Sequence, residues 1–315
     1  MMQHYTEKIK EIAKRLFEEE KIDIFIGYEK GTNPFFPRPT LISKIEDVNK
    51  LIWNSNCALN LCNYLTGRKE RIGIIANGCT SRSIVTHILE NQIKREQLYI
   101  VGIPCEGMLD YRKIQAAVDN KEILEIKENE KEFKVIGDGF EEAFNKEDFL
   151  QENCLACTHP NPVIYDEIIA EPVSTRAARP EYEDIKEIEE MPIEKRRFHI
   201  QKLLERCIRC YACRNVCPLC YCPTCFVDER IPWFGKSIDP TDTLTFHILR
   251  AFHCAGRCTD CGACERVCPV GIPIRIFIKK LNKDAFEIFS WEAGLSLEQK
   301  PLFAAYKKDD YDDFL

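Results

Sequence analysis

The sequence CIRCYACRNVCP occupies residues 207–218, and CTDCGACERVCP occupies residues 258–269. Both stretches follow the pattern C-x2-C-x2-C-x3-C-P, which is the ligand spacing of a [4Fe-4S] cluster. Chance is a poor explanation, because eight cysteines and two prolines must fall in the same register twice. The two runs therefore predict a pair of iron–sulfur clusters and a function in electron transfer.

The spacing also predicts how the cysteines are shared between the clusters. Three ligands of a cubane cluster come from one tight turn, and in two-cluster ferredoxins the fourth comes from the other run. The expected ligand sets are Cys207, Cys210, Cys213 and Cys268 for the first cluster, and Cys258, Cys261, Cys264 and Cys217 for the second. Zinc is the alternative, since C-x2-C pairs also bind it, but two runs of this length fit zinc poorly.

The bulk composition is that of a globular protein with room for two domains. The chain has 315 residues and a formal net charge of −7, which argues weakly against nucleic acid as a partner. It has 18 cysteines, yet its N-terminus is charged throughout and lacks an apolar signal core. No apolar run approaches the roughly 20 residues that a membrane helix needs, so no membrane insertion is expected. We therefore expect a cytoplasmic, anaerobic setting in which clustered cysteines hold metal.

The N-terminal half has the pattern of an α/β domain. Apolar strands are expected at residues 71–76 and 98–103, and helices between them favour a short, mainly parallel sheet. Cys79 and Cys105 come just after these strands, at the sheet edge where ligands bind in parallel α/β folds. Cys154 and Cys157 form a C-x2-C pair further on. These four cysteines suit a third cluster; the alternative is that Cys79 and Cys105 are small core residues and that Cys154 and Cys157 hold zinc or nothing.

Other patterns give the expected organisation of the chain. Apolar spacing predicts helices within residues 9–17, 45–65, 83–90 and 239–252, and a β pair at residues 122–126 and 133–136. Asp239 is the expected cap of the last of these helices, with Pro240 at its first position. The expected units are an α/β domain at 1–170, a linker at 171–194, an all-α domain at 195–285 and a tail at 286–315.

The C-terminal runs resemble a known module. A helix expected between the two runs separates them more widely than in a small β ferredoxin. Residues 195–281 resemble the α-helical ferredoxin domain found in heterodisulfide reductase C and in succinate dehydrogenase iron–sulfur subunits. This resemblance implies an all-α domain with two [4Fe-4S] clusters.

The N-terminal half resembles another family. The stretches GIIANGCTSR, LYIVGIPCEGMLD and NCLACTHPNPVIYDEII are similar to the β subunits of deazaflavin (coenzyme F420)-dependent hydrogenases and formate dehydrogenases. The resemblance covers residues 71–171 and implies a third cluster on Cys79, Cys105, Cys154 and Cys157, with FAD as a candidate cofactor. The chain departs from the family pattern in placing its ferredoxin part after this domain, and it has no GxGxxG or Walker motif.

Several residues have no assigned function at this stage. Cys220, Cys222, Cys225 and Cys254 are alternative ligands, a small extra metal site or buried thiols. Arginines near the runs either tune the clusters or are solvated surface groups; they are Arg206, Arg209, Arg214, Arg257 and Arg266. His159, His247 and His253 are expected to be packing or surface residues, and no catalytic residue is predicted.

Together these patterns predict an iron–sulfur electron-transfer subunit of a multisubunit oxidoreductase, with other redox subunits as partners. The catalytic partner would be a hydrogenase, a formate or aldehyde dehydrogenase, or a heterodisulfide-reductase-like module. The alternative is a self-contained flavin and iron–sulfur reductase that acts on a small substrate or a deazaflavin coenzyme. A metal-stabilised scaffold without redox chemistry is a third possibility.

Overall fold

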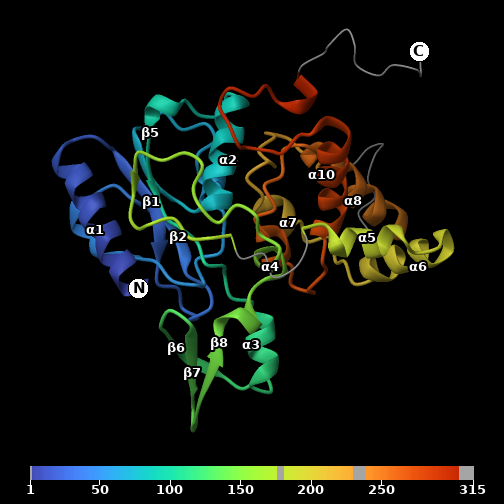
Figure 1. Cartoon of the computed structure of the whole chain (residues 1–315), viewed down its shortest axis with the longest axis horizontal. Coiled ribbons are helices and arrows are strands. Elements are labelled where there is room, and N and C mark those ends of the chain that lie inside the picture. The colour runs from blue at the N-terminus through green and yellow to red at the C-terminus, as the bar shows by residue number, and fades with distance from the viewer. Residues whose placement is uncertain (1, 176–180, 230–238, 305–315) are drawn as a thin grey trace.

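The computed structural model describes residues 2–175, 181–229 and 239–304 (Figure 1). An α/β part forms the N-terminal half, a small antiparallel sheet projects from it, and the C-terminal helices pack against its other side. The N-terminal helices are α1 (Met2–Glu18), α2 (Gly78–Leu89), α3 (Tyr111–Ala117) and α4 (Glu152–Leu155), and the short 3-10 helices are η1 (Ile45–Lys50), η2 (Leu61–Tyr64), η3 (Arg95–Gln97) and η4 (Lys146–Phe149).

The main sheet has six strands and is mixed. Its order is β2-β1-β4-β5-β9, with β3 also paired to β1. The strands are β1 (Ile24–Glu29), β2 (Arg38–Ile42), β3 (Leu51–Ile52), β4 (Ile72–Ala76), β5 (Leu98–Gly102) and β9 (Glu167–Ile168). The central pairings β1–β4, β4–β5 and β5–β9 are parallel, whereas β2 and β3 run antiparallel to β1. The predicted α/β domain is confirmed, with a sheet that is parallel from β1 to β9 and antiparallel where β2 and β3 pair with β1.

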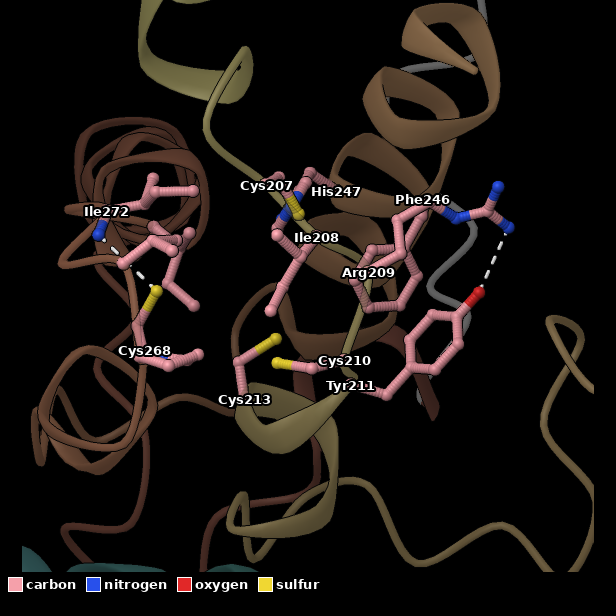
Figure 2. Close-up of a pocket in the computed structure, with 13 residues that line it drawn as sticks. Cys207, Ile208, Arg209, Cys210, Tyr211, Cys213, Phe246, His247, Cys268 and Ile272 are labelled. Atoms are coloured by element: carbon pink, nitrogen blue, oxygen red, sulfur yellow. Dashed lines mark hydrogen bonds between the residues drawn. The ribbon is translucent and has the colours of Figure 1, made fainter. Parts of the chain in front are cut away.

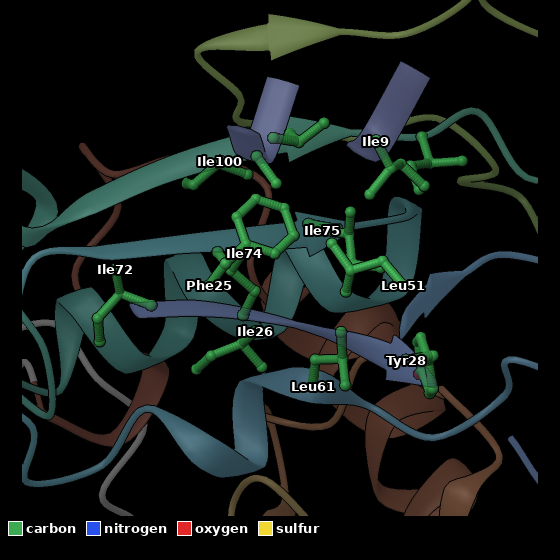
Figure 3. Packing of buried hydrophobic residues seen from close by; sticks show 14 of the residues in the cluster. Ile9, Phe25, Ile26, Tyr28, Leu51, Leu61, Ile72, Ile74, Ile75 and Ile100 are labelled. Atoms are coloured by element: carbon green, nitrogen blue, oxygen red, sulfur yellow. The ribbon is translucent and has the colours of Figure 1, made fainter. Parts of the chain in front are cut away.

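The core lies on both faces of this sheet. Every residue of β4 is buried, as expected for a strand covered on both sides. Ile9 of α1 and Leu61 of η2 pack from opposite sides of the strands (Figure 3). Burying a side chain of this size contributes roughly 1.5–3 kcal/mol. The predicted amphipathic helix at residues 9–17 is confirmed, and it begins seven residues earlier, at Met2.

The predicted helix at residues 45–65 is wrong. The segment forms η1, β3, an irregular loop and η2 instead. Asn54 accepts a hydrogen bond from the backbone N–H of Asn56, and Asn60 accepts one from Cys62. Asparagine side chains that satisfy nearby N–H groups in this way compete with helical hydrogen bonds.

A second sheet of three antiparallel strands stands beside α3. Its strands are β6 (Ile123–Glu128), β7 (Glu132–Gly137) and β8 (Phe140–Asn145). Phe133 and Val135 of β7 pack with Ile114 and Val118 in a core separate from the main one. The predicted β pair is confirmed. Sequence reasoning did not predict β8, whose residues are exposed or only half-buried.

The described C-terminal residues, 181–229 and 239–304, contain helices and loops but no strand. The helices are α5 (Glu183–Glu189), α6 (Ile193–Leu204), α7 (Ala212–Asn215), α8 (Pro240–Cys254), α9 (Ala263–Arg266), α10 (Arg275–Phe289) and η5 (Leu302–Ala304). The predicted α8 is confirmed, with Asp239 accepting from the N–H groups of Thr241 and Asp242. Within the described ranges no helix is long and apolar enough to span a membrane.

The helical part is tied to the α/β part by buried polar contacts. Arg266 is 7% exposed, and its guanidinium donates to the backbone carbonyls of Phe35, Asn56 and Leu109. Residues 290–304 run back toward α2, where Arg82 donates to the carbonyl of Ala293. Part of the expected linker (176–180) and the acidic end of the tail (305–315) lie outside the described residues.

Candidate metal centres

The first cysteine group surrounds one small apolar pocket. Its members are Cys207, Cys210, Cys213 and Cys268, and their sulfur atoms lie around a common space (Figure 2). The rest of the lining is mostly aliphatic and aromatic, including Ile208, Phe246 and Ile272. Cys268 thus lies with the three cysteines of the other run, which is the crossed grouping that the sequence predicts. Whether this group binds a cluster stays a prediction.

The second group brings Cys217, which follows α7, together with cysteines in and just before α9. The Cys217 thiolate interacts electrostatically with Cys258, Cys261 and Cys264, and it packs with Cys258 in one buried cluster. The side chain of Asn60, from the N-terminal half, hydrogen-bonds to Cys261. This group is therefore built jointly by the two halves of the chain.

Both runs bend in the same unusual way. Arg209 and Tyr211 have φ of 49° and 59°, and the corresponding Asp260 and Gly262 have φ of 54° and 72°. Left-handed backbone at non-glycine residues is costly and persists where the surroundings enforce it. At Gly262 a Cβ atom would also lie 2.3 Å from the Asn153 side-chain oxygen.

Backbone N–H groups point at the sulfurs, one of them from this bend and one from the segment after the second run. The Asp260 N–H donates to Cys258 Sγ at 3.4 Å, and the Ile272 N–H donates to Cys268 Sγ at 3.3 Å. N–H donors to sulfur are what a bound iron–sulfur cluster uses, so the residues present fit such a group.

The third group lines a large cavity at the carboxyl edge of the main sheet. Cys79, Cys105, Cys154 and Cys157 are all on its wall, and Cys261 of the second group joins them. Asn77 links two of the four, since its amide contacts Cys79 at 3.3 Å and Cys105 at 3.7 Å. The structure thus brings together the four cysteines that the sequence places in three separate segments.

Helix α2 positions Cys79. Asn77 caps this helix by accepting from the N–H of Thr80, so the positive end of the helix dipole faces the cavity. Gly78 is required here, because a Cβ atom would lie 2.0 Å from the carbonyl oxygen of His159. That close approach holds the 157–160 segment, with Cys157, against the start of the helix.

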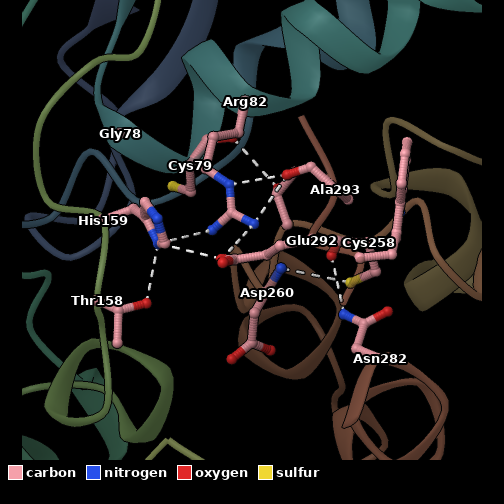
Figure 4. A network of polar contacts seen from close by, with 12 residues as sticks. Gly78, Cys79, Arg82, Thr158, His159, Cys258, Asp260, Asn282, Glu292 and Ala293 are labelled. Carbon is pink, nitrogen blue, oxygen red and sulfur yellow. Dashed lines mark hydrogen bonds and ion pairs between the residues drawn. The ribbon is translucent and has the colours of Figure 1, made fainter. Parts of the chain in front are cut away.

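Charged residues close one side of the cavity (Figure 4). Arg82 donates to the Ala293 carbonyl and pairs with Glu292 at 2.9 Å. His159 Nδ1 lies 3.2 Å from the same carboxylate and 2.9 Å from the Thr158 hydroxyl. This network links α2, the loop after Cys157 and the segment that follows α10.

The cavity has a volume of about 940 Å³ and a lining of both polar and apolar groups. Its basic side chains include Arg82, Lys131 and Lys146, and its acidic ones include Glu130 and Asp260. The turn between β6 and β7 contributes to this lining, so the small sheet forms one wall. A volume of this size is within the range of cofactor and ligand sites.

Burial keeps most of these thiols protonated in the absence of metal. It raises the pKa of Cys105 to about 11 and that of Cys261 to about 11, and it also raises the pKa of Cys154. Metal binding has to displace these protons, because a thiolate is the ligand. Cys217 differs, since hydrogen bonds from the Cys220 and Cys254 thiols lower its pKa well below the usual range.

The other residues singled out from the sequence differ in burial. His247 is buried with its Nε2 3.4 Å from Cys207 Sγ, and burial lowers its pKa to about 4. Cys222 is exposed and Cys225 half-buried.

Sequence reasoning missed Asn60, Asn77 and Arg250, a buried arginine that donates to the Cys213 carbonyl. No motif marks Asn60 and Arg250, because they reach the cysteine groups through tertiary packing, whereas Asn77 stands two residues before Cys79 and could have been found from that spacing.

Comparison with known proteins gives a consistent result. The chain is 23% identical to the F420-dependent formate dehydrogenase subunit beta of Methanocaldococcus jannaschii, over 93% of this chain and 92% of that protein. The expected family resemblance is confirmed. The F420-dependent formate dehydrogenase 1 subunit beta of Methanococcus maripaludis is also 23% identical, over 92% of this chain and 91% of its own. The resemblance therefore extends across the C-terminal cysteine runs as well.

Other matches are partial or weak. A component of the ion-translocating oxidoreductase complex of Buchnera aphidicola is 34% identical, but over only 24% of this chain and 14% of that protein. Among solved structures, the F420-reducing [NiFe] hydrogenase complex of Methanosarcina barkeri matches 64% of this chain and 86% of the other, at 15% identity and a TM-score of 0.39. That score is too low to support an argument. No family model matches the chain.

Proposed function

We propose that the chain is an iron–sulfur electron-transfer subunit of a multisubunit oxidoreductase. The observation that carries this proposal is the placement of three cysteine groups in series. Cys261 of the second group shares the cavity wall with Cys79 of the third, and Cys264 packs against the apolar cluster that contains Cys213 of the first. Bound [4Fe-4S] clusters would supply one-electron transfer, while the chain supplies thiolates, N–H donors and burial.

The series has two distinct ends. At one end the third group opens into the large cavity, and at the other Cys210 of the first group is exposed. We infer that electrons enter or leave at the cavity and at the Cys210 surface. Partner subunits are inferred because similar proteins are named as subunits of F420-dependent formate dehydrogenase. A cytoplasmic location belongs to the same proposal.

The experiment is metal and cofactor analysis after anaerobic purification. Iron, sulfide, zinc and flavin per chain are measured, followed by EPR spectra of the reduced protein. About twelve irons per chain support three clusters, since each holds four. About eight would remove the cavity cluster from the proposal, and zinc in place of iron would overturn the relay. Co-purification with a large redox subunit then tests the subunit assignment.

The cavity supports a second candidate, a self-contained flavin and iron–sulfur reductase. Its volume of about 940 Å³ leaves room for FAD beside the cysteine wall. In that case the chain alone would reduce a deazaflavin coenzyme or another small substrate at the cavity. Stoichiometric flavin and turnover without any added subunit would favour this function. A flavin-free protein that needs a partner for turnover would favour the relay.

A further inference from the structure

Three thiols form a compact cluster beside the second cysteine group. The Sγ atoms of Cys217, Cys220 and Cys254 all lie within 4.8 Å of one another. Cys217 is a member of the second group, whereas Cys220 and Cys254 belong to none of the three groups. The structure therefore has two further thiols directly against one proposed cluster ligand.

The local fold holds these thiols in place. The N–H of Cys220 donates to the carbonyl of Cys217, which forms a turn that returns Cys220 to its neighbour. Cys254 is the last residue of α8 and is 1% exposed. Both thiols pack in the same small apolar core, which includes Leu219 and Ile278.

A closed metal site does not explain the cluster. Structural zinc sites use four protein ligands, and the group found among the described residues offers three. One of the three, Cys217, also lies with Cys258, Cys261 and Cys264, where a cubane needs its fourth ligand. Packing of the two spare thiols against Cys217 in one small apolar core accounts for the short distances without a further ion.

Resting on the proposed function, we propose that Cys220 and Cys254 are positioning residues that donate S–H hydrogen bonds to the Cys217 sulfur and raise the reduction potential of the second cluster. Donors to a ligand sulfur stabilise the more negative, reduced state of a cluster. The N–H of Leu219 adds a donor to the same sulfur, and the buried Arg250 adds positive charge nearby. The first group has no such pair of thiols among the residues described around its pocket.

The test is an EPR-monitored redox titration of the full-length holoprotein. The variants are Cys220→Ala, Cys254→Ala and the double variant, with Cys254→Ser as the conservative substitution that keeps a donor. Cys222→Ala is the matched control, since Cys222 is exposed on the same loop. We expect wild-type iron content and a shift of one signal to more negative potential, larger in the double variant, with the serine and control variants close to wild type.

Other outcomes would overturn the inference. Loss of about four irons in Cys254→Ala would make Cys254 a ligand. One zinc per chain that disappears in the variants would make the cluster a metal site. Full iron content with unchanged reduction potentials in the variants would mean that Cys220 and Cys254 serve only in packing. That result would overturn this inference and leave the proposed function standing. Wild-type protein without iron would instead overturn the proposed function and this inference together.

Discussion

The two cysteine runs have the same spacing but different surroundings. The first group lies within the C-terminal helices, and Cys210 is exposed. The second group lies at the junction of the two halves, where Asn60 reaches Cys261 and Arg266 reaches three carbonyls of the N-terminal half. The comparison teaches that the same motif can serve two purposes. In the first run it places a cysteine group at the protein surface, and in the second it helps to join the two halves of the chain.

Equivalent cysteines of the two runs should give the largest difference. We expect Cys210→Ala to lose about four irons and to keep the fold, because its site lies at the surface. Cys261→Ala should lose its own cluster, disturb the cavity group and lower the melting temperature. Iron and sulfide per chain and thermal unfolding under anaerobic conditions measure both effects. Equal losses of iron and stability in the two variants would contradict the comparison.

The next contrast is between Arg266 and Asn215, which hold the same position in the two runs. Arg266→Ala removes a charged donor from three buried carbonyls, so we expect a loss of about 3 kcal/mol or more in unfolding free energy. Asn215 is exposed, so Asn215→Ala should change stability by less than about 0.5 kcal/mol. Denaturant unfolding of both variants provides the measurement, and a small effect at Arg266 would show that the junction does not depend on it.

The arginines that directly precede the two runs, Arg257 and Arg206, provide a further comparison of stability. Arg257 pairs with Glu90 and donates to the Tyr221 hydroxyl at 2.7 Å, across the junction. We expect Arg257→Ala to cost about 1–3 kcal/mol, because a half-buried carboxylate loses its charged donor. Arg206 is exposed, and its guanidinium donates to the Gly271 carbonyl at 3.4 Å, so Arg206→Ala serves as the control. Similar losses in unfolding free energy for both variants would remove the distinction between the two sites.

The smallest expected effect depends on pH. His87 is fully buried, its Nε2 bonds to the Pro218 carbonyl at 2.7 Å, and burial lowers its pKa. As the pH falls below about 6.5, the His87 imidazole takes up a proton in the unfolded chain before it does so in the folded protein. The free energy of unfolding should therefore decrease on acidification.

The matched variants are His87→Gln and His199→Gln. A glutamine at position 87 can still donate to Pro218 but does not titrate, so we expect a weaker pH dependence. His199, half-buried on α6, should leave that dependence unchanged when replaced. Melting temperatures at about pH 7.5 and about pH 5.5, on either side of the ordinary histidine pKa, decide the matter. Parallel curves for wild type and His87→Gln would refute the expectation.

The sequence predicts local features and misses those made by distant segments. The strand before Cys79 and the capped helix α8 follow from short-range patterns. The prediction of a helix at residues 45–65 failed because asparagine side chains there hydrogen-bond to the backbone, and a hydrophobic pattern carries no information about such bonds. Asn60 reaches Cys261 from a distant part of the chain, so no spacing rule marks it.

Arg266 also bears on how this polypeptide could be divided. A break in the stretch between α4 and α6 would yield two fragments, and each would expose half of a buried contact surface. The C-terminal fragment would carry an arginine without the carbonyls of Phe35 and Leu109, and the N-terminal one would lack the cover over α2. Neither fragment would be an independent folding unit, so each half should fold only in the presence of the other.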